Sequence, residues 1–201
     1  MGRQFKRVIP DNVNLRGLRS GEINPLDIAC GSTKCGDDLH CFSRYMKQAE
    51  KKYGKKGVCY NCGNDSIDWE RIHKKDIRDV KYVFTSLNKE LIRQVFTTMR
   101  IEKIAIDEAM KLGRNNLRIQ AQKQLKRRIG KYNDYKDGQQ TPLGGENIIN
   151  YAQHATATCC RKCLEAWYNI PKDQELTDLQ LDFCTELTMF YINDKIPQLK
   201  E

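Results

Sequence analysis

The side chains best suited to chemistry are cysteines, and eight of the nine fall into two groups along the chain. The first group is Cys30, Cys35, Cys41, Cys59 and Cys62, and the second is Cys159, Cys160 and Cys163. Each contains a Cys-x-x-Cys pair, whose thiolates can reach one tetrahedral ion at about 2.3 Å when a tight turn separates them. Gly63 directly follows Cys62, where a chain reversal often requires a positive φ. We therefore predict a zinc knuckle at 59–62.

The partners of this knuckle should come from the cysteines that precede it. Cys35 and Cys41 are favoured over Cys30 because the GDDLH segment between them can form a compact turn, and His40 is a spare donor. The predicted ligands of the first site are therefore Cys35, Cys41, Cys59 and Cys62, with Cys30 as a further candidate. The expected cofactor is Zn²⁺, and an iron–sulfur cluster is the less favoured alternative.

The second group offers His154, Cys159, Cys160 and Cys163 within ten residues. Adjacent residues on a helix point about 100° apart, so we expect Cys160 and Cys163 to bind metal together with His154, while Cys159 turns to the core. Cys159 stays a further candidate ligand. Cys184 or a water molecule could complete this site, and a water would leave it open. The alternative is that these four residues only pack the start of a helix.

Helical periodicity dominates the segments that must hold these groups. A short helix is expected at 43–52, and Ser86 is expected to cap a helix over 87–99 whose apolar residues recur at every fourth position. A long helix is predicted at 107–129, weakened at Gly113, and a final helix begins at Thr177 with a Thr177/Gln180 capping box. The glycine-rich stretch 137–147 should be a loop.

Strand signals are few, so the sequence predicts a mostly α fold: a small helical domain with one or two zinc-binding Cys/His modules. We expect an irregular basic arm at 1–29, a cysteine-rich zinc module at 30–76 and a helical domain with the His/Cys cluster at 77–201. A chain of 201 residues can bury a core without disulfides. We find neither an apolar run of the roughly 18 residues that a membrane span needs nor a secretory signal, which predicts a cytoplasmic protein without membrane partners.

Charge gives the clearest indication of a partner, because 35 Lys and Arg against 26 Asp and Glu leave a net charge of +9. Between residues 109 and 133 there are eight basic residues and no acidic one. They are Lys111, Arg114, Arg118, Lys123, Lys126, Arg127, Arg128 and Lys131. A solvated helix face usually mixes signs, so this run predicts an anionic partner, with plain solvated surface as the alternative.

The stretch QHATATCCRKCLEAW at 153–167, together with DGQQTP at 137–142, resembles a bacterial and phage family of unknown function. That family carries the signature HATATCC-R-x-C-L and an upstream DGxQTP loop. The resemblance covers roughly residues 103–192, and the N-terminal cysteine module resembles an extension found in longer members. Similar members have His after the Trp of CLExW, where this chain has Tyr168. The resemblance implies shared residues but no activity.

The leading hypothesis is a zinc-binding protein that binds nucleic acid through the basic helical face, in a strongly salt-dependent manner. A second hypothesis is a metal-dependent enzyme acting on nucleic acid, a nuclease or base-processing activity, with His154 and Arg161 as catalytic candidates. A third is a protein-interaction module that the metals only hold in shape. The sequence leaves open the choice between DNA and RNA and the oligomeric state.

Overall fold

The computed structural model describes residues 30–131 and 138–201, and the basic arm expected at 1–29 lies outside the described residues. The protein is mostly helical, as predicted. Its α-helices are α2 (Met46–Tyr53), α3 (Trp69–His73), α4 (Val80–Leu87), α5 (Leu91–Thr98), α6 (Lys103–Ile129), α7 (Ile148–Ala155), α8 (Arg161–Tyr168) and α9 (Asp178–Lys195). Two 3₁₀ turns, η2 (Cys35–Asp37) and η3 (Ile77–Asp79), precede α2 and α4. None of the helices in the described residues combines the length and apolar character that crossing a bilayer requires.

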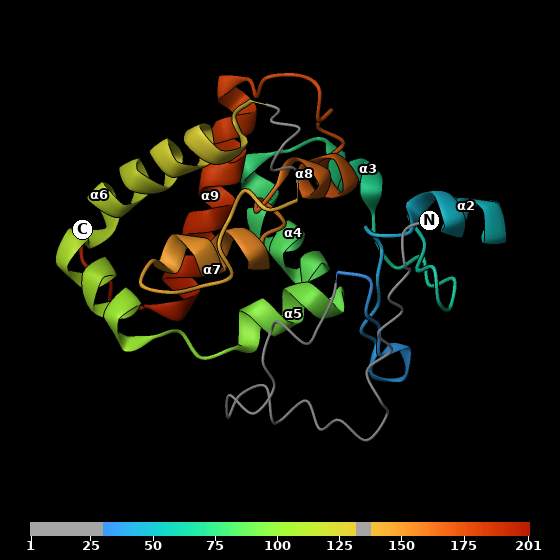
Figure 1. Ribbon diagram of the computed structural model, residues 1–201, viewed down its shortest axis with the longest axis horizontal. Helices are drawn as coiled ribbons and strands as arrows, with labels where there is room; N and C mark the ends of the chain where they lie inside the picture. The colour runs from blue at the N-terminus through green and yellow to red at the C-terminus, as the bar shows by residue number, and fades with distance from the viewer. Residues whose placement is uncertain (1–29, 132–137) are drawn as a thin grey trace.

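Helix α9 forms the centre of the helical body, with α4, α6 and α7 packed around it and α5 against α7 (Figure 1). Its capping box is confirmed: the Thr177 hydroxyl accepts from the Gln180 N–H at 3.2 Å, and the Gln180 side chain accepts from the Thr177 N–H at 3.0 Å. Tyr191 and Ile192 on this helix are fully buried. The helix is therefore fixed at its start by local hydrogen bonds and along its length by burial.

Helix α6 follows the prediction, although it begins four residues earlier than expected. Gly113 interrupts it with a positive φ of 72°, and a Cβ at this position would lie 2.9 Å from the carbonyl oxygen of Glu201. The Arg114 N–H donates to the carbonyl of Lys200 at 2.7 Å. The kink thus allows the C-terminal end of the chain to dock against the helix, a close approach that only glycine permits.

The helix predicted at 87–99 is instead two helices, and the expectation that Ser86 caps it is wrong. Ser86 lies in the last turn of α4, and α5 begins at Leu91. The break has a tertiary cause: the His40 N–H donates to the carbonyl of Lys89 at 2.8 Å, and the Leu91 N–H donates to the carbonyl of His40 at 2.9 Å. This parallel bridge to the N-terminal segment overrides the continuous helical periodicity of the sequence.

The N-terminal segment 30–68, which carries α2, lies at one end of the helical body beside α3 and α8 (Figure 1). Phe42 meets Trp69 and Trp167 edge-on at ring-centroid distances of 6.4 and 6.3 Å. These aromatic rings share one core with Leu164 of α8 and Leu181 of α9. Because of this shared core, the module and the helical body are packed as one unit.

Candidate metal centres

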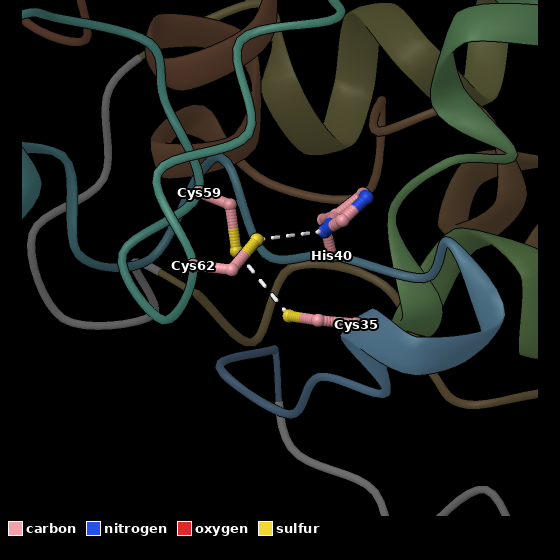
Figure 2. A group of neighbouring side chains, drawn as sticks. All are labelled: Cys35, His40, Cys59 and Cys62. Carbon is pink, nitrogen blue, oxygen red and sulfur yellow. Dashed lines mark hydrogen bonds between the residues drawn. The ribbon is translucent and has the colours of Figure 1, made fainter.

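The first cysteine group converges on one point, where Cys35, His40, Cys59 and Cys62 place their ligand atoms within 4.8 Å of one another (Figure 2). The Cys35 and Cys59 sulfurs are 3.9 Å apart, and the Cys62 sulfur is 3.4 Å from His40 Nδ1. Sulfurs bound at about 2.3 Å to a single tetrahedral ion lie about 3.8 Å apart, and a sulfur–nitrogen pair slightly less. The four atoms therefore have the spacing of a closed tetrahedral site.

Two short turns bring these ligands together. In the knuckle, the Gly63 N–H donates to the Cys59 carbonyl at 2.8 Å with Gly63 at φ 78°, as the sequence predicts. Upstream, Asp38 adopts a left-handed conformation at φ 57° and Lys34 pairs with Leu39 in an isolated bridge. This second reversal turns the chain after η2. His40, which directly follows Leu39, therefore faces the knuckle from the same side as Cys35 (Figure 2).

Groups around the ligands fix their orientation and charge. Asp38 Oδ1 lies 2.8 Å from His40 Nε2, which leaves Nδ1 for the metal in the carboxylate–histidine–metal arrangement of many zinc sites. The Asn61 side-chain amide donates to the Cys35 sulfur at 3.4 Å. Partial burial alone would raise the pKa of Cys35, but hydrogen bonds from Asn61 and His40 hold it at about 7. The thiolate form needed for metal binding is therefore favoured.

In the second group, the sulfurs of Cys159, Cys160 and Cys163 lie within 4.8 Å of one another, and all three residues are buried. The sulfurs of Cys159 and Cys163 are 3.6 Å apart. Cys160 is the N-cap of α8 with extended dihedral angles of φ −160° and ψ 164°, so Cys159 and Cys160 precede the helix rather than lying on it. The 100° divergence expected for adjacent helical residues does not apply, and both sulfurs join Cys163.

A buried ion pair lies beside this group. Arg93 is 1% exposed, and its guanidinium donates to the sulfur of Cys163 at 3.2 Å and to Glu90 Oε2 at 3.1 Å. Hydrogen bonds from the Cys159 and Cys160 thiols, followed by the charge of Arg93, lower the pKa of Cys163 well below its ordinary value. A buried guanidinium needs counter-charge, and here a carboxylate and a sulfur cluster provide it.

Glu90 also contacts the segment that follows His40. It is 0% exposed, and its Oε1 accepts from the backbone N–H groups of Phe42 and Ser43, each at 3.0 Å, and from the Ser43 hydroxyl at 2.7 Å. Oε2 accepts from the Trp167 indole at 2.9 Å in addition to Arg93. A single carboxylate therefore joins the segment after His40, helix α5 and helix α8. No sequence signal distinguishes Glu90 from an ordinary surface glutamate.

Three predicted or suggested ligands lie outside both groups. The Cys41 sulfur is not among the converging ligand atoms and donates to the carbonyl of Cys30 at 3.3 Å, so the prediction of Cys41 as a ligand is wrong and His40 takes its place. Cys184 is buried in α9, and its charged neighbours are Arg161 and Lys75 rather than the other cysteines. Cys30 is exposed as a residue and belongs to neither group of converging ligand atoms, but burial of its thiol, followed by the nearby Cys163, raises the pKa of that thiol.

The two predicted catalytic residues, of which His154 was also a predicted ligand, are engaged elsewhere. His154 stacks on Phe96 with ring centroids 4.5 Å apart, and its Nε2 lies 3.0 Å from the carbonyl oxygen of Pro142. Arg161 is fully buried and donates to the backbone carbonyls of Ile129, Pro171 and Gln174. These contacts position backbone segments, and they assign neither residue to a metal group.

The predicted basic face of α6 is partly neutralised by residues distant in sequence. Arg118 pairs with Glu186 at 2.6 Å, Arg114 with Glu201 at 3.6 Å and Lys131 with Glu175 at 3.6 Å. Lys111 pairs with Glu108 at 2.5 Å within the helix, and Arg128 donates to the Asn150 side chain at 2.6 Å. Lys123, Lys126 and Arg127 are exposed and form no ion pair within the described residues.

A second basic surface, which sequence reasoning missed, lies on the N-terminal module. We define the α2 surface as the six exposed basic residues Arg44, Lys47, Lys51, Lys52, Lys55 and Lys56. The only acidic residue between 44 and 56 is Glu50, which pairs with Lys56 at 3.7 Å, while Lys55 pairs with Asp65 at 2.6 Å. The run of basic residues between 44 and 56 was the sequence signal that could have predicted this surface.

A cleft of about 920 Å³ separates the α2 surface from α8. Its basic lining residues are Arg44, Lys47, Lys56 and Lys162, and its acidic ones are Glu50 and Glu165. Cys160 and Cys163 also line it, together with Trp69. The cleft therefore connects the basic surface with the second cysteine group.

Comparison with known protein families matches residues 81–193 to a domain of unknown function, DUF4186. The matched region runs from α4 to α9 and contains Glu90, Arg93 and the second cysteine group, whereas the first centre precedes it. No solved structure matches the chain.

Proposed function

The chain belongs to the DUF4186 family, and we propose that this member is a zinc protein that binds nucleic acid through the α2 surface of its N-terminal module. The observation that carries the proposal is the position of this surface: the basic segment 44–56 lies between two converging ligands, His40 and Cys59. An ion bound by both closes the intervening segment into a loop and holds α2 in place. Metal binding and the presentation of positive charge are thereby coupled.

The donor set supports zinc for the first centre. Three cysteine sulfurs and one imidazole nitrogen form a closed Cys₃His set, which is typical of structural zinc sites. In a [2Fe–2S] or [4Fe–4S] cluster the ligands are spread over two or more irons, so some of the ligand atoms lie farther apart than around a single ion. The convergence of all four ligand atoms within 4.8 Å of one another favours a single ion. Zinc-binding thiols must stay reduced, so we propose a reducing compartment, the cytoplasm, for this protein.

Charge distribution supports nucleic acid as the partner. Arg44, Lys47 and Lys51 are exposed and form no ion pair within the described residues. In this part of the chain, two of the six basic residues of the α2 surface are in ion pairs, against four of the eight predicted for the α6 face. Phosphate contacts from such side chains supply affinity without sequence specificity. If about four basic residues of this surface contact a duplex, log K should fall against log salt with a slope of about −4.

The experiment compares two matched triple variants of the zinc-loaded full chain by fluorescence anisotropy with labelled duplex DNA and single-stranded RNA. R44Q/K47Q/K51Q removes one arginine and two lysines from the α2 surface, and K123Q/K126Q/R127Q removes the same set from α6. We expect the first variant to weaken binding strongly and to make the salt slope shallower by about 3, while the second changes little. The opposite ranking would assign binding to the α6 face, and a salt-independent affinity would exclude phosphate recognition.

A further inference from the structure

The second cysteine group is buried, but two of its residues border the cleft between α2 and α8. Cys160 and Cys163 line the cleft between α2 and α8, and they are 6% and 8% exposed. On the protein side, the guanidinium of Arg93 donates to Cys163 at 3.2 Å and contacts Cys159 at 3.9 Å, and Arg93 itself is almost fully buried. The sulfurs therefore lie between a buried cation and the cleft.

The spacing of the sulfurs suits one ion. The Cys159 and Cys163 sulfurs are 3.6 Å apart. Two sulfurs bound at about 2.3 Å to one tetrahedrally coordinated ion would be about 3.8 Å apart, which is close to this distance. The start of α8 adds the partial positive charge of the helix dipole, which stabilises thiolates there. Arg93 adds a full positive charge. Both features favour the deprotonated ligands that a metal needs.

We propose that Cys159, Cys160 and Cys163 hold a second Zn²⁺ ion whose fourth coordination position faces the cleft and takes water or a small anion. The described residues supply three sulfurs, and we assign the fourth position to the cleft because Cys160 and Cys163 line it. An exchangeable fourth position is typical of catalytic rather than structural zinc. The site lies within the region matched to the family, so it belongs to the family domain rather than to the N-terminal module.

The cleft has the charge that an anionic ligand would need. Its basic residues, Arg44, Lys47, Lys56 and Lys162, outnumber its acidic ones, Glu50 and Glu165. A zinc ion with three thiolates carries one negative charge, which Arg93 offsets at the cluster. The cleft lining then supplies the attraction for an incoming anion. The competing structure is a closed site in which Cys30, which also lines the cleft, is the fourth ligand.

The test uses the full chain loaded with Co²⁺, whose visible absorption reports coordination geometry and whose sulfur-to-metal charge transfer reports the number of thiolates. We expect two Co²⁺ ions per chain and a shift of the visible bands on titration with azide. C160S should lose one ion together with the azide response. C62S should disturb the other ion and keep the response, because Cys62 belongs to the first centre.

C30S decides between the open and the closed site. We expect this variant to bind two ions and to show an unchanged azide response. A loss of one ion in C30S, or two bound ions in the wild type without any azide response, would overturn the proposal, as would a single bound ion in the wild type. The azide titration of the wild type needs no substitution, so the proposal stays testable if C160S does not fold.

Discussion

Substitution of Glu90 by glutamine should destabilise the protein more than its conservative size suggests. The carboxylate is fully buried and accepts five hydrogen bonds, of which two come from Arg93 and Trp167 and three from Phe42 and Ser43. E90Q replaces one accepting oxygen by an NH₂ group that faces donors, and it removes the carboxylate opposite the buried Arg93 guanidinium.

The magnitude follows from the buried charge. Removing one partner of a buried ion pair typically costs about 3–5 kcal/mol, because the other charge stays buried without compensation. The Cys163 sulfur still faces Arg93 at 3.2 Å, so the lower end of that range, about 3 kcal/mol, is the expected loss. Domains are stable by only about 5–15 kcal/mol, so this is a large fraction of the total.

The assay is urea unfolding of the zinc-loaded chain followed by far-ultraviolet circular dichroism. E70Q is the matched control, since the side chain of Glu70 is 88% exposed and its substitution should leave the midpoint unchanged. The double variant E90Q/R93M should lose less than the two single variants together, because it removes the uncompensated charge as well. A loss below about 1 kcal/mol in E90Q would refute the assignment of Glu90 as a paired buried carboxylate.

Three further predictions concern other parts of the molecule. Burial, followed by the charge of Arg93, lowers the pKa of His154 to about 4 in the folded chain. In the unfolded chain the pKa of this histidine is near 6.5, so between about pH 6.5 and 4 the unfolded chain binds one proton more than the folded chain. The free energy of unfolding should therefore fall by about 3 kcal/mol as the pH drops from 6.5 to 4, which urea unfolding at each pH would measure. H154Q should make the free energy of unfolding less dependent on pH in this range. An unchanged pH dependence in H154Q would contradict the burial of a neutral imidazole. G57A should lower the unfolding midpoint more than G54A, because both positions have positive φ but only at Gly57 would a Cβ meet a neighbour, Trp69 Nε1 at 2.1 Å; equal losses would mean that the indole moves freely. Chelation of zinc should open segment 44–56 to trypsin while the lysines of α6 stay protected, and equal cleavage with and without the chelator would contradict a metal-closed loop.

Local patterns predicted much of the fold because they act over a few residues. The Thr177/Gln180 capping box and the turn at Gly63 depend on near neighbours or on glycine geometry. Gly113 was expected only to weaken its helix, and the kink there accommodates the distant C-terminal end of the chain. The break at Glu90 could not be predicted in this way, because it is imposed by hydrogen bonds to His40, about fifty residues earlier. Helical periodicity carries no information about such a partner.

The same distinction explains the ligand sets. Spacing grouped Cys35 with the Cys59 and Cys62 knuckle, and the structure brings these three sulfurs together. Spacing could not decide between His40 and Cys41, because adjacent residues in an extended segment point to opposite sides. The backbone pairing of His40 with Lys89 and Leu91 sets which of the two faces the knuckle. In the second group, the extended conformation before α8 likewise decides which sulfurs converge, and it brings Cys159 as well as Cys160 to Cys163.

Glu90 and Arg93 show why the N-terminal module and the family domain form one folding unit. Both residues lie within the matched region 81–193, yet all three donors to Glu90 Oε1 come from Phe42 and Ser43, outside that region. Without the module, one carboxylate oxygen would lose all three of its protein donors and would have to bind water instead, while the other would still face Arg93 and Trp167. The buried ion pair with Arg93 would then lose part of the low-dielectric surroundings that strengthen it. The module therefore does more than carry a metal site: it completes the hydrogen bonding of the residue that also supports the Arg93 guanidinium beside the second cysteine group.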